Sequence, residues 1–327
     1  MGASPQRTQP VRPLSGGRMS EHKLMASDAP EFSVVIATYN DWKPLNECLR
    51  SLSEQIAAPS FEVVVIDDGS GSAAPESIQA WGKHYPLTVV RQEHAGISAA
   101  RNRGAQQARG AVLVSVDADC KLQKGCLAAL AATMAEHPQR NYFQLHITGD
   151  RSCLVGRAEE LRLITVQSHL RQEDGCIKYL NTAGFAMRRI RAEITGGIFD
   201  PDALRAEDTL FLANLMRRDE LPWFVENAVV QHAIPLNVMQ CWLKDVRSAY
   251  LEAGTYDAIA AMGVRVRVTH RERAAMLRSM WRTSAQHSIG RMAWFVLLVR
   301  QVLRLVVLKL AQSAGSRIHA RVAEKSP

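Results

Sequence analysis

The stretch Phe32-Ser-Val-Val-Ile-Ala-Thr-Tyr-Asn40 (FSVVIATYN) decides the fold class of this chain. Its first seven residues are apolar or β-branched almost without interruption, which is typical of a parallel strand covered on both faces of its sheet. Similar runs begin at Phe61, Leu87 and Ala111, and helix-like stretches at 45–55 and 97–108 lie between them. Alternating strands and helices predict an α/β fold with right-handed crossovers.

Polar residues follow three of these predicted strands. They are Tyr39-Asn-Asp41, Asp67-Asp-Gly-Ser70 and Asp117-Ala-Asp119. Open parallel sheets bind ligands beyond the carboxyl ends of their strands, so these residues are expected to surround a site. No GxGxxG follows a strand and no GxxxxGK[ST] occurs, which disfavours dinucleotide-binding and P-loop proteins.

Asp117 and Asp119 are the first candidates for metal binding. Residues i and i+2 of an extended chain project from one face, and two adjacent carboxylates repel unless a cation lies between them. Hard oxygen ligands suit Mg²⁺ or Mn²⁺. The alternative is a pair of turn-forming aspartates before the next helix, and Asp68 in Asp-Gly-Ser has the same alternative.

The motifs together are more specific than any one of them. FSVVIATYN, VVVIDDGS (63–70), HAGISAARNRG (94–104) and VDAD (116–119) resemble the nucleotide-binding half of the family 2 glycosyltransferases. TAGFAMRR (182–189), GGIFD (196–200), AEDT (206–209) and VVQH (229–232) resemble the acceptor half. The resemblance covers about residues 32–235. It implies a GT-A fold, in which helices flank a Rossmann-like, mostly parallel central sheet.

Composition, the resemblance and helical spacing together divide the chain into three parts. Residues 1–30, rich in Pro, Ser, Gly, Gln and Arg, are expected to form a disordered arm. Residues 31–235 are expected to form the GT-A domain. Residues 236–327 are expected to form a helical C-terminal extension, with a basic, apolar helix at about 292–310.

On the donor side, the resemblance assigns a role to each matching position. The backbone at Ala37 and the side chain of Tyr39 would flank the nucleotide base, Asp68 would accept a hydrogen bond from it, and Asp117 would hold the ribose. Asn102 follows the predicted helix start at residues 94–96, where a helix N-terminus favours phosphate. Packing of that helix on the sheet is the alternative reading of Asn102.

For metal and catalysis, the resemblance points to Asp119, His232 and Asp208. Asp119 would bind a divalent metal (Mn²⁺ or Mg²⁺), and His232 would complete its shell, unless it is a structural histidine. Asp208 would be the general base, because an aspartate is already ionised at pH 7. Gly184 and Glu207 would lie in the acceptor region.

Two departures from the family pattern fall on the acceptor side. Residues 197–200 hold one residue more than usual between the glycines and Phe-Asp, and Ala206 replaces a common glycine. These two departures leave the donor motifs unchanged, but they mean that the family pattern does not identify the acceptor.

The amino-acid composition indicates the class of protein and the cellular compartment in which it is expected. The chain has 327 residues, of which 47% are hydrophobic and 22% charged, so collagen-like and low-complexity classes are excluded. Six scattered cysteines without a CxxC pair give no zinc or redox motif and suit a reducing compartment. The N-terminus lacks an apolar signal-peptide core, so a cytoplasmic protein is expected, with peripheral contact at the inner face of the cell membrane.

The net charge of +8 is concentrated in the C-terminal tail. Residues 271–327 carry eleven Lys or Arg against two Glu. Such a tail suits an anionic phospholipid surface, and a solvated basic helix is the alternative. It lacks aromatic interleaving or a nucleic-acid motif, so no nucleic-acid partner is expected.

Residues 293–310 are apolar at 14 of 18 positions, with Arg300, Gln301, Arg304 and Lys309 between them. These charges make a membrane-spanning helix a poor interpretation. Arg300, Gln301 and Arg304 share one helical face, which favours a helix in a membrane interface. A helix packed on the rest of the protein is the next alternative, and a spanning helix the last.

The sequence thus predicts an inverting, metal-dependent glycosyltransferase. Its donor would be a nucleotide-diphospho-sugar, with a UDP-sugar favoured, and its acceptor a hydroxyl of a saccharide, lipid-linked if the tail meets a membrane. Such a reaction fits surface polysaccharide or glycan assembly. One alternative is transfer to a polyprenyl phosphate, and another is a non-catalytic nucleotide-sugar or glycan binding module.

Overall fold

The computed structural model describes residues 29–189, 191–233, 236–266 and 269–323. Nearly all of the predicted N-terminal arm therefore lies outside the described residues.

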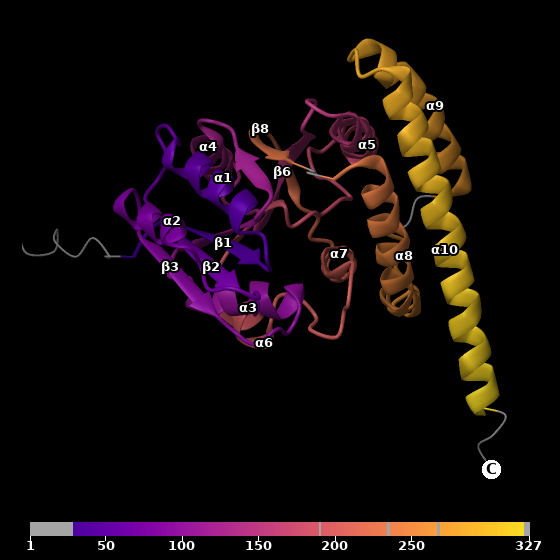
Figure 1. Ribbon diagram of the computed structural model, residues 1–327, viewed down its shortest axis with the longest axis horizontal. Helices are drawn as coiled ribbons and strands as arrows, with labels where there is room; N and C mark the ends of the chain where they lie inside the picture. The colour runs from indigo at the N-terminus through magenta and orange to yellow at the C-terminus, as the bar shows by residue number, and fades with distance from the viewer. Residues whose placement is uncertain (1–28, 190, 234–235, 267–268, 324–327) are drawn as a thin grey trace, which may run out of the picture.

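A mixed sheet forms the centre of the molecule, with the strand order β3-β2-β1-β4-β7-β6-β8-β5 (Figure 1). Strands β1 to β4 are mutually parallel, whereas β7 and β5 run antiparallel to their neighbours. The prediction of an α/β fold built on parallel strands is confirmed. The strands are β1 (Phe32–Thr38), β2 (Phe61–Asp67), β3 (Leu87–Arg91), β4 (Val112–Asp117), β5 (Cys120–Leu122), β6 (Tyr142–Gly149), β7 (Gly184–Arg188) and β8 (Trp223–His232).

Helices cover both faces of this sheet (Figure 1). Helices α1 (Trp42–Ser53) and α4 (Cys126–Glu136) bury Leu49 and Leu130 against one face. Helices α3 (Ile97–Gln107) and α7 (Glu207–Arg217) bury Ala105 and Phe211 against the other. Burial on both faces explains the unbroken apolar runs of β1, β2 and β4. Three short elements complete this part: α2 (Glu76–Gln79), the 3-10 helix η1 (Ala80–Lys83) and α6 (Arg191–Gly196).

A layer of four helices lies beside the sheet (Figure 1). They are α5 (Leu154–Leu170), α8 (Val238–Ala261), α9 (His270–Gln286) and α10 (Arg291–Ala323). Asn237 and Thr269 begin α8 and α9 with reciprocal capping bonds to Gln240 and Glu272, which satisfy otherwise free N–H groups. Met280 of α9 and Leu297 of α10 pack with Leu161 of α5.

Helix α10 lies on the outside of this layer and packs against α8, α5 and α9. The face that carries Arg300 and Arg304 points inward, to ion pairs with α8 and α5. The polar face predicted from the sequence therefore contacts protein rather than water. None of the helices within the described ranges combines the length and the apolar character needed to cross a bilayer.

Candidate functional site

A cavity of about 770 Å³ opens at the carboxyl ends of β1, β2 and β4. From there it runs past the start of α7 to the helical layer, where residues of α5, α8, α9 and α10 form its far wall. Ligands of open α/β sheets bind at this edge. The predicted site residues that line it are Ala37, Tyr39, Asp68, Asp117, Asp119, Glu207, Asp208 and His232.

Asp68 holds the loop that leads into α3. Its buried carboxylate accepts hydrogen bonds from the backbone N–H groups of Ala95 (2.9 Å) and Gly96 (2.9 Å) and from Gln92 Nε2 (2.7 Å). His94 Nδ1 lies 2.9 Å from its second oxygen. Four partners use the acceptor capacity of a carboxylate, so the structure gives Asp68 a loop-holding role; the contact with a base stays a prediction.

Two aromatic rings stand at the donor end of the cavity. Tyr39 and His94 stack with ring centroids 4.4 Å apart and an interplanar angle of 29°. Tyr39 follows β1 and His94 comes after β3, so two parallel strands that flank β2 bring the two rings to the same edge of the sheet. Since Tyr39 is 47% exposed, the pair offers a flat, accessible surface on which a planar base can stack.

Arg101 joins the donor and acceptor sides of the cavity. It lies buried on α3, donates a hydrogen bond of 2.6 Å to Asp117 and forms a short ion pair with Glu207 at the start of α7. Burial opposes its charge, but the carboxylates of Asp117 and Glu207 raise the pKa of the guanidinium well above its usual value. This bridge fixes the end of β4 relative to α7.

Asp119 and His232 form the candidate metal centre. His232 Nε2 lies 3.3 Å from Asp119 Oδ2, and the Cys120 thiol is close to both. Asp119 follows β4 and His232 ends β8, whose neighbour β5 begins at Cys120. The sequence placed Asp117 and Asp119 around one cation, whereas the structure pairs Asp117 with Arg101 and Asp119 with His232.

Asp119 and His232 stabilise each other's charge in this structure. Burial raises the pKa of Asp119 and lowers that of His232, but their mutual hydrogen bond and charge outweigh burial and reverse both shifts. Burial and the adjacent Asp119 and Asp117 carboxylates raise the pKa of the Cys120 thiol, which makes it a poor ligand. A carboxylate with an imidazole fits Mn²⁺ well and Mg²⁺ less well.

Asp208 lies on the first turn of α7 and lines the cavity. Its Oδ1 accepts hydrogen bonds from the backbone N–H (2.6 Å) and the hydroxyl (3.1 Å) of Thr209. Burial and the Glu207 carboxylate raise the pKa of Asp208 to about 7, although Arg101 opposes the shift. The sequence argument took an ordinary aspartate, already ionised; the structure instead gives a carboxyl whose pKa is close to neutral pH, where a general base works best.

Ala206 precedes Asp208 in the left-handed conformation, with φ of 62°. This region costs an L-residue about 1 kcal/mol and is free to glycine, which gives a physical reason for the glycine common at this position in related sequences.

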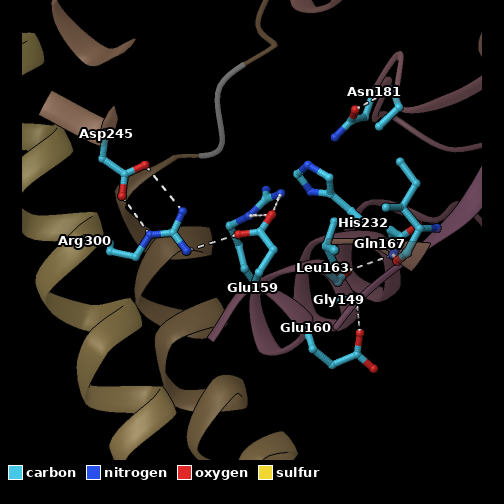
Figure 2. Close-up of polar contacts among 12 residues, drawn as sticks. Gly149, Glu159, Glu160, Leu163, Gln167, Asn181, His232, Asp245 and Arg300 are labelled. Carbon is cyan, nitrogen blue, oxygen red and sulfur yellow. Dashed lines mark hydrogen bonds and ion pairs between the residues drawn. The ribbon is translucent and has the colours of Figure 1, made fainter. Parts of the chain in front are cut away.

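The far wall of the cavity carries a buried network of charges (Figure 2). Arg300 of α10 donates to Asp245 of α8 (2.7 Å) and to Glu159 of α5 (3.2 Å). Glu159 also accepts from Arg162 (2.5 Å). Burial disfavours the Glu159 charge, but Arg162 and Arg300 hold its pKa well below the usual range. The charge of Glu159, on α5, also raises the pKa of His232.

Two predicted residues lie apart from the cavity wall. The Asn102 side chain accepts from the N–H groups of Ile198 (3.0 Å) and Phe199 (2.9 Å) and donates to the Phe199 carbonyl (2.7 Å). It therefore positions the 197–200 loop. Gly184 is buried in β7, where an added Cβ would lie 3.2 Å from Ile147. The neighbouring Asn181 and Thr182 line the cavity instead.

The sequence did not predict the ion pairs of Arg101, the ring stacking of His94 or the helical wall of the cavity. His94 and Arg101 lie within the quoted HAGISAARNRG motif, but nothing local reveals that Arg101 meets Glu207, which is 106 residues away. The pairing of Arg300 with Glu159 spans 141 residues and has no sequence signal of its own.

Known proteins with similar sequences are described as glycosyltransferases, as the motifs predict. Residues 33–194 match the model described as Glycosyl transferase family 2. An uncharacterized glycosyltransferase YibD of Escherichia coli is 26% identical over 211 residues, which cover 62% of this chain and 57% of the relative. For the first three curated relatives the match covers between 27% and 57% of their own length.

Solved structures show the same fold. Mannosyltransferase PcManGT from Pyrobaculum calidifontis, in complex with GDP-Man and Mn²⁺, is 17% identical, covers 87% of each chain and has a TM-score of 0.60. Staphylococcus aureus TarS 1–349, in complex with UDP-GlcNAc, is 18% identical, covers 88% of this chain and 92% of its own, with a TM-score of 0.51. The predicted GT-A fold is confirmed. The ordered motifs and the matched family model identify residues 33–194 as a family 2 glycosyltransferase domain, and the solved structures share its fold.

Proposed function

We propose that this protein transfers a sugar from a nucleotide-diphospho-sugar to an acceptor hydroxyl with inversion at the anomeric carbon. The observation that carries the proposal is Asp208, a cavity-lining carboxyl with a pKa of about 7, tied through its neighbour Glu207 and Arg101 to the strand end that bears Asp117. One bridge thus spans the donor and acceptor sides of the cavity.

The donor would lie across the ends of β1, β2 and β4. Its base would stack on Tyr39 and His94, and the backbone at Ala37 would flank it. Asp117 would accept a hydrogen bond from the ribose. UDP-sugars and GDP-sugars are both candidates, because structures of the same fold bind UDP-GlcNAc and GDP-Man.

Asp119 and His232 would hold a divalent cation, Mn²⁺ or Mg²⁺, which would neutralise charge on the leaving diphosphate. Lys244 of α8 lines the same end of the cavity, and its charge also acts on Asp119. The ammonium group of Lys244 would add a second positive charge near the diphosphate.

In the transfer, Asp208 would take the proton from the acceptor hydroxyl. The hydroxyl oxygen would form a bond to the anomeric carbon while the bond from that carbon to the diphosphate oxygen breaks. The nucleoside diphosphate leaves with the bonding electrons, and the anomeric configuration inverts. A positioned base contributes about 10²–10⁴-fold to such a step.

The far wall of the cavity favours an acceptor attached to a lipid. Met276, Leu277 and Met280 of α9, with Leu298 and Leu305 of α10, give this wall an apolar part beside its charged network. A saccharide on a lipid carrier fits it, and so does a polyprenyl phosphate, which is the second candidate acceptor. Either acceptor places the reaction at the cytoplasmic face of a membrane, where the protein would be peripherally bound.

The Asp208→Asn variant tests this proposal. Its turnover of nucleotide-sugar in the presence of a membrane extract is expected to fall about 10³-fold, with nucleotide binding unchanged. Full retained activity would favour a phosphate acceptor, which is already an anion and needs no base. Absence of nucleotide binding in the wild-type protein would contradict the donor site itself and favour a non-catalytic module.

A further inference from the structure

Helix α10 exposes five large apolar side chains while it buries the charged side chain of Arg300. Arg300 is only 8% exposed, whereas the outward side chains of α10 are between 50% and 65% exposed. We call this outward set the outer stripe: Met292, Phe295, Val302, Val306 and Leu310. An ordinary surface helix has the opposite arrangement, with charges outward.

The outer stripe is long and continuous. Its members are separated by three, seven, four and four residues, which are all helical repeats, so they share one face about 27 Å in length. Figure 1 shows α10 as the outermost element of the helical layer, on the side away from the sheet. Apolar patches of this size on a soluble surface mark an interaction site.

Basic side chains and a tryptophan border the stripe. Trp281 of α9 is 48% exposed, packs edge-on to Trp294 of α10 and lies under the Arg291 guanidinium. Arg278 and Arg282 are exposed on α9, and Lys309 is exposed on α10. The sequence of α10 from Arg291 to Ala323 contains no acidic residue.

We propose that the outer stripe docks on an anionic lipid surface, with α10 lying in the plane of the interface. Apolar side chains would enter the acyl boundary, Trp281 would lie at headgroup level, and the basic rim would meet lipid phosphates. A second copy of the chain is a poorer occupant, because two like faces would bring basic residues together without an acidic partner on either α10.

This docking does not depend on the proposed reaction, but it gives that reaction a geometry. Leu298, Val302 and Leu305 of α10 also line the cavity, so a docked α10 would place the cavity wall against the membrane. A lipid-linked acceptor could then reach the site without leaving the bilayer; this last step rests on the proposed function.

Vesicle sedimentation tests the docking. The full-length protein is mixed with vesicles of phosphatidylcholine, alone or with one-third phosphatidylglycerol, at low and at high salt. We expect binding to the anionic vesicles that weakens about tenfold or more as salt screens the basic rim. Val306→Glu is expected to weaken binding about tenfold, since it places a charge in the stripe.

Ile56→Glu is the matched control, because it makes the same kind of change at an exposed site after α1, away from α10. Ile56→Glu should bind like the wild-type protein, and the charge reversal Arg278→Glu with Arg282→Glu should weaken anionic binding alone. Circular dichroism and nucleotide calorimetry on each variant check that the fold and the donor site are intact.

Three results would overturn the docking proposal. They are failure of the wild-type protein to bind anionic vesicles, equal losses in Val306→Glu and Ile56→Glu, and a change of oligomeric mass in Val306→Glu without a change in vesicle binding. Nucleotide binding separates the two proposals. Vesicle binding without nucleotide binding contradicts the proposed transfer reaction and leaves the docking intact. Nucleotide binding without vesicle binding contradicts the docking and leaves the transfer reaction intact.

Discussion

The donor half of the molecule and its helical layer face the same cavity but are assembled differently. In the donor half, parallel strands β1, β2 and β4 place Tyr39, Asp68 and Asp117 at one edge, because each residue follows its own strand. In the helical layer, α10 is held by apolar packing of Leu297 and by buried ion pairs from Arg300 to Asp245 and Glu159. Backbone hydrogen bonds between strands define the first arrangement, and side-chain contacts between helices define the second.

The two halves can therefore be perturbed separately: one forms the donor pocket, and the other positions the far wall of the cavity. The donor half forms its pocket from residues in short motifs at strand ends, whereas the far wall forms from side chains of helices that are distant in sequence. Two buried arginines, Arg101 and Arg300, represent the two halves, and each bridges two carboxylates. Substituting one arginine at a time therefore tests one half of the molecule at a time.

The largest effects are expected from Arg101→Met and Arg300→Met. Each leaves two carboxylates of the native protein without their buried cation, which costs about 3–5 kcal/mol of the free energy of unfolding. Chemical denaturation of both variants measures this loss. Only Arg101→Met should also weaken nucleotide binding, since Arg101 holds Asp117. Equal loss of nucleotide binding in both variants would remove the distinction between the halves.

The pH dependence of turnover sharpens the role of Asp208. Its pKa of about 7 means that the ionised base is lost as the pH falls below 7. kcat/KM should therefore fall about tenfold per pH unit below pH 6. A rate that is flat between pH 5 and pH 8 would contradict this assignment.

The same shift also affects stability. The folded pKa of Asp208 lies above its unfolded value of 3.8, so the folded state favours the protonated acid. Its favourable contribution is present below pH 4 and is lost as the pH rises to 7. Asp208→Asn should thus be more stable than the wild-type protein at pH 8, by a few kcal/mol, and nearly equal at pH 4, in thermal denaturation at each pH.

Much of the donor side could be predicted from the sequence, because Asp68, Asp117 and Asp119 stand in short motifs directly after strands. Asp208 and His232 were found through their motifs as well. What could not be predicted is which partner each charge takes. Arg101 with Glu207, and Arg300 with Glu159, join residues more than a hundred positions apart. Helical periodicity grouped Arg300 and Arg304 on one face, but periodicity does not say whether that face meets water or protein.

Asp68→Asn tests the loop-holding role at smaller cost. An amide nitrogen would replace one acceptor oxygen, so the hydrogen bonds from Ala95 and Gly96 cannot both be kept. We expect a loss of about 1–3 kcal/mol in the free energy of unfolding and weaker nucleotide binding. If stability is unchanged while binding is lost, Asp68 acts on the base directly and the loop does not need it.

The smallest effect is expected from Ala206→Gly. Glycine relieves the backbone strain of the left-handed conformation at φ of 62° and so stabilises the folded state. This gain is offset because glycine has more conformational freedom in the unfolded chain. The net change should stay within about 1 kcal/mol. A larger loss in thermal denaturation would show that the Ala206 methyl group packs at the start of α7.

One measurement tests the central claim most directly. UDP, GDP, dTDP and CMP are titrated by calorimetry, each with and without Mn²⁺, into the wild-type protein and Asp119→Ala. The account predicts metal-dependent binding of one nucleoside diphosphate that Asp119→Ala loses, which would also name the donor class. Failure of all four to bind the wild-type protein, with or without Mn²⁺, would contradict it.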